Sequence, residues 1–195
     1  MGDTYQTHRI MAKISQARGE CGGAADLWRY AASLARASHG DSHNTLGADI
    51  LGVVLKEPIG VVSIITPWNF PFWILSQKLP FALAAGCTCV VKPSEMTPST
   101  TAMLGELLNE AGLPKGTVNV IHSSSDKAPD IVEALIAHPA VRRVNFTGST
   151  RVGRMIAEKA ARHLKRCLLD LGGKAPLLVL DDADIDAAVD AAVFG

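Results

Sequence analysis

Two side chains in this sequence combine a reactive group with a setting suited to catalysis. Asn69 lies between two prolines in the run P-W-N-F-P (67–71), which restrict the backbone, and a fixed amide can donate a hydrogen bond to a developing oxyanion. Asp170 lies between apolar residues in L-D-L-G-G-K (169–174), where a carboxylate suits a general base. Each also has a simpler interpretation, since Asn69 could only stabilise a turn and Asp170 could be a surface residue at a strand end.

Two further runs have the residue types that bind sugars and phosphates. K-P-S-E (92–95) brings Lys92 and Glu95 together, where they could hold the two hydroxyls of a ribose or simply form a solvated ion pair. F-T-G-S-T (146–150) places a glycine before a predicted helix, and a helix N-terminus favours a phosphate. The simpler alternative is an ordinary turn with Ser149 as the helix cap. This run is neither G-x-G-x-x-G nor a P-loop.

The elements that must position these motifs alternate between short apolar runs and amphipathic helical runs. The predicted strands are residues 60–65, 87–91, 118–121, 144–146, 168–171 and 177–180. The predicted helices are a stretch that ends near residues 85–86, then 97–112, 130–137, 151–161 and 184–193. This alternation predicts an α/β fold with a Rossmann-like, doubly wound parallel sheet and right-handed crossovers. Ligands of such sheets bind beyond the carboxyl ends of the strands, where all four motifs lie.

The first 58 residues do not follow this alternation. Residues 12–39 have the pattern of a helix interrupted near Gly22-Gly23. Its apolar face comprises Leu27, Tyr30, Ala31 and Leu34. Residues 40–58 are predicted to form an extended arm or hairpin outside the sheet. The predicted divisions are therefore a helical segment at 1–39, an arm at 40–58 and the doubly wound domain at 59–195.

The overall composition argues against several classes of protein. Nineteen Lys and Arg balance nineteen Asp and Glu, so the chain lacks the positive charge of a nucleic-acid binder or of a protein attracted to anionic membranes. Neither a secretion signal nor a transmembrane span is evident. Four cysteines (21, 87, 89 and 167) lack disulfide or zinc spacing, so we expect no metal and buried free thiols in a reducing cytoplasm.

Taken in order, P-W-N-F-P, K-P-S-E, F-T-G-S-T and L-G-G-K resemble the motifs of the aldehyde dehydrogenase superfamily. The resemblance runs from about Ile14 to Gly195. It implies that residues 59–195 bind NAD, with NADP also possible, that the arm serves oligomerisation, and that the protein oxidises an aldehyde to a carboxylic acid. Homo-oligomers of the complete enzyme are implied as well.

The resemblance also assigns roles to individual residues. Asn69 takes the place of the family's oxyanion-hole asparagine, and Asp170 that of the glutamate that activates water. The implied cofactor-binding residues are Thr66, Pro67 and Trp68 on the nicotinamide side, Lys92, Ser94 and Glu95 at the adenine ribose, Phe146, Thr147, Gly148 and Ser149 near the pyrophosphate, Val152 near the adenine, and Leu171 and Gly172. Aspartate holds its carboxylate about 1 Å further back than glutamate, and a misplacement of that size can cost on the order of 100-fold in rate. Glu95 favours NAD by repelling a 2′-phosphate, an effect that Lys92 could offset.

The family's nucleophile is a cysteine in a G-Q-x-C type motif downstream of L-G-G-K, and none of the four cysteines lies in such a context. We therefore expect a partial copy of the family pattern, without the nucleophile, the substrate domain and the part before Ala12. Apolar surface left exposed would favour association. Two alternatives stay open: a non-catalytic nucleotide-binding or interaction protein, and a truncated product that does not fold. Residues 122–125 are more like the aromatic-aldehyde branch and 50–112 more like the betaine or aminoaldehyde branches, so the substrate is left open.

Overall fold

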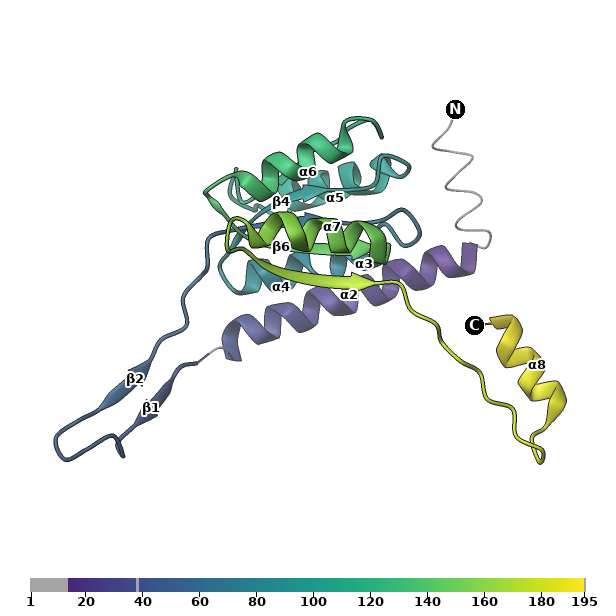
Figure 1. Ribbon diagram of the computed structural model, residues 1–195, viewed down its shortest axis with the longest axis horizontal. Coiled ribbons are helices and arrows are strands. Elements are labelled where there is room, and N and C mark those ends of the chain that lie inside the picture. The colour runs from purple at the N-terminus through teal and green to yellow at the C-terminus, as the bar shows by residue number, and fades with distance from the viewer. Residues whose placement is uncertain (1–13, 38, 195) are drawn as a thin grey trace.

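A five-stranded parallel sheet forms the centre of the molecule in the computed structural model, which describes residues 14–37 and 39–194 (Figure 1). Its strands, in spatial order, are β5 (Val118–Val120), β4 (Thr88–Lys92), β3 (Val61–Ile65), β6 (Val141–Gly148) and β7 (Arg166–Leu171). Every neighbouring pair is parallel. The predicted α/β class with a Rossmann-like, doubly wound sheet is confirmed.

Helices cover both faces of this sheet. On one face lie α3 (Trp73–Ser76), α4 (Leu79–Ala84) and α5 (Pro98–Glu110), and on the other α6 (Ala128–Ala137) and α7 (Thr150–Ala161). Side chains alternate along each strand, so Ile64 packs in the first core cluster and Ile65 in the second. No helix within residues 14–37 and 39–194 is long and apolar enough to span a membrane.

The cysteines are all free, but only some of them are buried. Cys87 and Cys89 belong to the first core cluster and are 5% and 0% exposed. Burial, with a contribution from the neighbouring Cys87, raises the pKa of the Cys89 thiol to about 12. Cys167 is half-buried. The expectation of buried thiols is wrong for Cys21, which lies on the exposed side of the N-terminal helix.

The N-terminal helix α2 (Ile14–Ala37) is continuous, so the predicted interruption at Gly22-Gly23 is wrong. The start predicted at residue 12 lies outside the described residues. Gly23 serves close packing instead, because a Cβ atom there would lie 1.9 Å from Cζ3 of Trp73 in α3. Gly22, one residue earlier, has no atom within 4 Å of the position of its Cβ. The glycine pair therefore reflects a contact between α2 and α3.

The buried face of α2 also differs from the expected one. Ala31 is buried, but Tyr30 is 57% and Leu34 is 39% exposed. Glu20 is buried instead, and its Oε1 accepts hydrogen bonds of 2.8 Å from the backbone N–H groups of Phe72 and Trp73. The two N–H groups at the start of α3 have no partner within that helix and need an acceptor. The Glu20 carboxylate supplies it, so a charged residue is buried on a helix face that the sequence pattern predicts to be apolar.

An antiparallel hairpin of β1 (Asp41–His43) and β2 (Gly52–Val54) projects away from the sheet (Figure 1). It lies within the segment expected to form an arm. Leu51, Val53 and Leu55 are 68%, 60% and 76% exposed. Exposed apolar side chains on a two-stranded hairpin favour association with another surface.

Residues 172–184 leave the sheet as an extended segment that ends in α8 (Ile185–Phe194) (Figure 1). The predicted strand at 177–180 is therefore wrong. Its residues Leu177 to Leu180 are exposed, and no described strand pairs with them. An apolar run resembles a strand in sequence, but a strand also needs a neighbour for its backbone hydrogen bonds, and Pro176 removes one donor just before the run.

Substitutions at the glycine pair of α2 test the packing of this helix. Gly22→Ala should stabilise the chain by about 0.5–1 kcal/mol, because alanine loses less backbone entropy in a helix. Gly23→Ala should instead destabilise it by about 1–2 kcal/mol, because the new methyl group must displace the Trp73 ring. Urea unfolding of both variants measures the difference. Equal stabilisation by the two substitutions would show that α2 does not pack on Trp73.

Candidate functional site

The carboxyl ends of β3, β4 and β6 border a cavity of about 510 Å³, which α6 and α7 close on the other side. This is the edge where open parallel sheets bind ligands. The residues named from sequence that line it are Thr66, Pro67, Lys92, Ser94, Glu95, Phe146, Thr147, Gly148 and Val152. Three motifs far apart in the chain are thus brought to one cavity.

Lys92 and Glu95 form an ion pair in the wall of this cavity. The Lys92 side chain is 5% exposed, and its Nζ donates to the carbonyl of Pro93 at 3.1 Å and lies 3.5 Å from Oε2 of Glu95. Oε1 of Glu95 accepts a hydrogen bond of 3.0 Å from the Ser125 hydroxyl. Burial raises the pKa of Glu95, but its hydrogen bonds and Lys92 outweigh this, so the pKa lies below its usual value. The pair therefore offers an ionised acceptor beside a cation.

The turn between β6 and α7 brings a helix N-terminus to the same cavity. The hydroxyl of Ser149 accepts from the N–H of Val152 at 3.3 Å, so the predicted cap is present. A Cβ on Gly148 would lie 2.5 Å from Cζ of Phe146, which explains why glycine is needed in this turn. Gly148 lines the cavity, whereas Ser149 does not. The positive end of a twelve-residue helix suits a phosphate group.

Sequence reasoning missed several lining residues. They are Ile65, Ser125, Ala128, Pro129, Val132, Arg151, Met155, Ile156 and Lys159. Arg151 follows F-T-G-S-T directly and could have been found from its position there. The contribution of α6 could not, because its packing beside α7 depends on contacts between distant parts of the chain.

Asp170 lies outside this cavity, in a cluster that Thr147 connects to it. The Thr147 hydroxyl donates to Oδ2 of Asp170 at 3.0 Å, and Nζ of Lys78 lies 3.9 Å from the same oxygen. The Asp170 side chain is 57% exposed, so the apolar enclosure expected for it is not found. On the edge strand β7, Asp170 shares a face with Arg166 and Leu168, which are also exposed, so this carboxylate is open to water.

Lys78 is the residue of this cluster that sequence reasoning missed. Its side chain is only 6% exposed, and burial lowers its pKa, an effect that the negative charge of Asp170 opposes. The available signal was a lysine within the apolar stretch of residues 70–86. A buried lysine near a carboxylate is uncommon without a structural or chemical role.

Other predicted site residues do not line the 510 Å³ cavity. Asn69 and Trp68 are exposed on the loop after β3. Leu171 is half-buried and packs against α7, where a Cβ on Gly153 would lie 2.4 Å from its Cδ2. Gly172 is exposed beyond the end of β7. The roles of these residues remain predictions.

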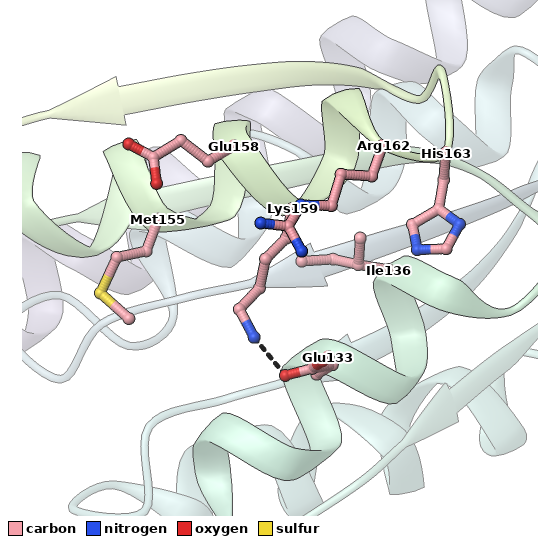
Figure 2. A pocket seen from close by; sticks show the side chains of 7 residues that line it. All are labelled: Glu133, Ile136, Met155, Glu158, Lys159, Arg162 and His163. Atoms are coloured by element: carbon pink, nitrogen blue, oxygen red, sulfur yellow. Dashed lines mark hydrogen bonds and ion pairs between the residues drawn. The ribbon is translucent and has the colours of Figure 1, made fainter.

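A second cavity of about 310 Å³ lies between α6 and α7 (Figure 2). Lys159 of α7 pairs with Glu133 of α6 across it, and Lys159 and Met155 line both this cavity and the larger one. Glu158 and His163 also border it.

In the part of the chain that the structure describes, no three metal-ligating side chains are placed to hold a metal ion.

Comparisons with known proteins agree on one family. The profile described as "Aldehyde dehydrogenase family" matches residues 4–195. Salicylaldehyde dehydrogenase of Pseudomonas putida is 52% identical over 171 residues, covering 88% of this chain and 35% of that protein. Vanillin dehydrogenase of Pseudomonas fluorescens is 51% identical over 175 residues, covering 88% and 36%. The chain thus spans about a third of the length of these curated relatives.

The fold is also found among solved structures. The crystal structure of an NAD-dependent aldehyde dehydrogenase from Sinorhizobium meliloti superposes with a TM-score of 0.90 at 52% identity, covering 97% of this chain and 37% of that one. This similarity extends over both the sheet and the flanking helices, since it covers nearly the whole chain.

Replacement of the buried lysine tests the electrostatics of the Asp170 cluster. Lys78→Met should stabilise the chain by roughly 1 kcal/mol at neutral pH, because it removes a buried ammonium whose partner is an exposed carboxylate. The pKa of Lys78 is lowered in the folded chain, so the unfolded chain keeps its proton longer as the pH rises. The parent therefore gains stability with pH, and the advantage of the variant shrinks toward about pH 10.

Urea unfolding of parent and variant over a series of pH values measures this effect. Lys127→Met is the matched control, since Lys127 is 65% exposed and pairs with Asp130 on its own helix end. An advantage of Lys78→Met that grows with pH, or one that the control shares, contradicts this interpretation.

Proposed function

This chain belongs to the aldehyde dehydrogenase family, and on that premise we propose that it binds NAD as part of an oxidoreductase that converts an aldehyde to a carboxylic acid. The observation that carries the proposal is the 510 Å³ cavity, which nine of the residues expected to contact the cofactor line together. The aldehyde-oxidising activity is proposed for the whole protein, since the chain spans about a third of its curated relatives.

The lining of the cavity fits a dinucleotide. Val132, Val152 and Ile156 offer an apolar wall for an adenine ring, and the Lys92–Glu95 pair offers a donor and an acceptor for ribose hydroxyls. The N-terminus of α7, with the cation of Arg151 beside it, suits the pyrophosphate. Volumes of 300–1,000 Å³ with few polar groups are typical of such sites.

Bound NAD would supply the acceptor for the hydride that leaves the substrate. The residues of this chain bind and orient it. The ionised Glu95 disfavours the additional phosphate of NADP by like-charge repulsion, so NAD is the proposed cofactor, although Lys92 reduces this preference.

The Asp170 cluster is proposed to handle the proton of a hydrolytic step, in which water releases the oxidised substrate as the carboxylic acid. Asp170 is exposed enough to contact a water molecule and accepts a hydrogen bond from Thr147, which fixes the position of its carboxylate. The positive charge of Lys78 lies near the same oxygen. Asp170 would accept a proton from water, and Asn69 would donate a hydrogen bond to the oxyanion of the substrate.

The substrate proposed is an aromatic aldehyde, because the relatives compared above are named for salicylaldehyde and vanillin. The exposed apolar hairpin β1–β2 supports a homo-oligomer of the whole protein. Four free cysteines fit a reducing compartment such as the cytoplasm.

Loss of the Lys92 cation tests the cofactor site. Lys92→Met should weaken NAD binding by about 10- to 100-fold, because a charged hydrogen bond contributes about 1.5–3 kcal/mol. Isothermal titration calorimetry with NAD measures the dissociation constant. Lys127→Met again serves as the control, since it breaks an ion pair of the same sequence spacing outside the cavity. Equal affinities for the parent and Lys92→Met would exclude this cavity as the nucleotide site.

Substitutions of Asp170 test the hydrolytic role in the protein that carries this sequence. Asp170→Glu should raise the rate of NAD-dependent salicylaldehyde oxidation, because it extends the carboxylate by about 1 Å, whereas Asp170→Asn should abolish it. NADH formation at saturating substrate measures the rate. Retained NAD binding without aldehyde oxidation in the parent itself would instead support a non-catalytic nucleotide-binding protein.

A further inference from the structure

A third cavity, of about 770 Å³ and lined by several cations, lies at the opposite end of the sheet from the proposed NAD site. It is lined by residues at the amino ends of β6 and β7 and by the segments leading into β3, β6 and β7. These residues are Ile59, Ala137, Pro139, Val141, Arg142, Arg143, His163, Leu164, Lys165 and Arg166. It shares no residue with the 510 Å³ cavity. We refer to Arg142, Arg143, Lys165 and Arg166 as the basic cluster.

Adjacent strands present like charges to each other in the basic cluster. Arg143 of β6 and Arg166 of β7 are direct partners in the register of the two strands. The register of β6 against β3 shifts between the partners of Val61 and Val62, which leaves Arg142 at an irregularity of the strand. Like charges directly opposite each other destabilise a sheet, and bulges re-aim side chains at functional edges.

The four cations lack a close carboxylate partner in the described part of the chain. Within residues 14–37 and 39–194, the ion pairs of 4.0 Å or less include none of the four cations. The side-chain ammonium of Lys165 donates to the backbone carbonyl of His138. Burial lowers the pKa of the Lys165 ammonium, and the positive charge of Arg142 lowers this pKa further.

Unusual backbone conformations lie at the same place. Leu164, with φ of 53°, is the left-handed residue that ends α7, where the N–H groups of Leu164 and Lys165 donate to the carbonyls of Ala161 and Ala160, and its side chain is 94% exposed. Gly60, with φ of 107°, lies so close to Arg142 that a Cβ there would be 3.3 Å from the Cγ of the arginine. The cations of two neighbouring strands and of the turn after α7 therefore share one concave surface.

We propose that this cavity binds a small multivalent oxyanion, with phosphate or carboxylate groups that bridge the paired arginines Arg143 and Arg166. Two guanidinium groups from neighbouring strands can each form paired hydrogen bonds to such groups, and a ligand with several negative charges offsets several cations at once. The concave shape and the volume suit a small molecule. A net charge of zero over the whole chain argues against a nucleic acid.

Titration with inorganic pyrophosphate and, separately, with citrate tests the site. Each is added to the purified chain in the presence of saturating NAD, so that the nucleotide cavity is occupied, and binding is measured by calorimetry. We expect a single class of site for at least one anion, and the tighter of the two identifies phosphate or carboxylate as the preferred group. The double variant R143Q/R166Q should weaken this binding by about tenfold or more, without loss of NAD affinity.

The control is R36Q/R154Q, which removes the same number of charges at exposed arginines outside the cavity. It should change anion affinity less than about twofold at 0.15 M salt. Thermal unfolding of R143Q/R166Q shows that the variant is folded, since removal of the facing charges should leave its midpoint unchanged or raised. The proposal is overturned if neither anion binds, if NAD abolishes binding, or if both double variants weaken it equally.

Discussion

The direction of the chain on either side of β3 is the constraint on which the site depends. From β3 the chain proceeds through α3 and α4 to β4 and then β5 on one side, and it returns through α6 to β6 and then β7 on the other. The loops after β3 and β6 therefore diverge toward opposite faces of the sheet. A crevice forms at the carboxyl ends of these strands, because neither set of connections covers it.

Successive side chains at the end of β6 point to opposite faces of the sheet, and this alternation links the crevice to Asp170. Phe146 packs in the core beside α6 and α7, and its ring lies where any side chain on Gly148 would go. Thr147, between them, lines the cavity and donates to Asp170 on β7. One short segment therefore shapes the nucleotide cavity and orients the carboxylate, so changes in the position of β6 would affect both.

The sequence predicted those parts of the fold that depend on local patterns. Apolar runs identified all five strands of the central sheet. Ligands of parallel sheets bind at the carboxyl ends of the strands, and from this rule K-P-S-E and F-T-G-S-T were expected at the edge where both now line one cavity. Features that depend on distant contacts were missed. Gly23 accommodates Trp73 rather than breaking α2. Lys78, between α3 and α4, lies 3.9 Å from Asp170 of β7. Residues 177–180 lack a partner strand in the described part of the chain.

Hydrogen–deuterium exchange with and without NAD tests the central claim most directly, because it reports where the nucleotide contacts the chain. The account predicts that NAD slows amide exchange at residues 92–96, from the end of β4, and at 146–153, around the start of α7. The hairpin β1–β2 and helix α8 should exchange as before. Protection confined to other segments, or none at saturating NAD, would contradict the assignment of this cavity as the nucleotide site.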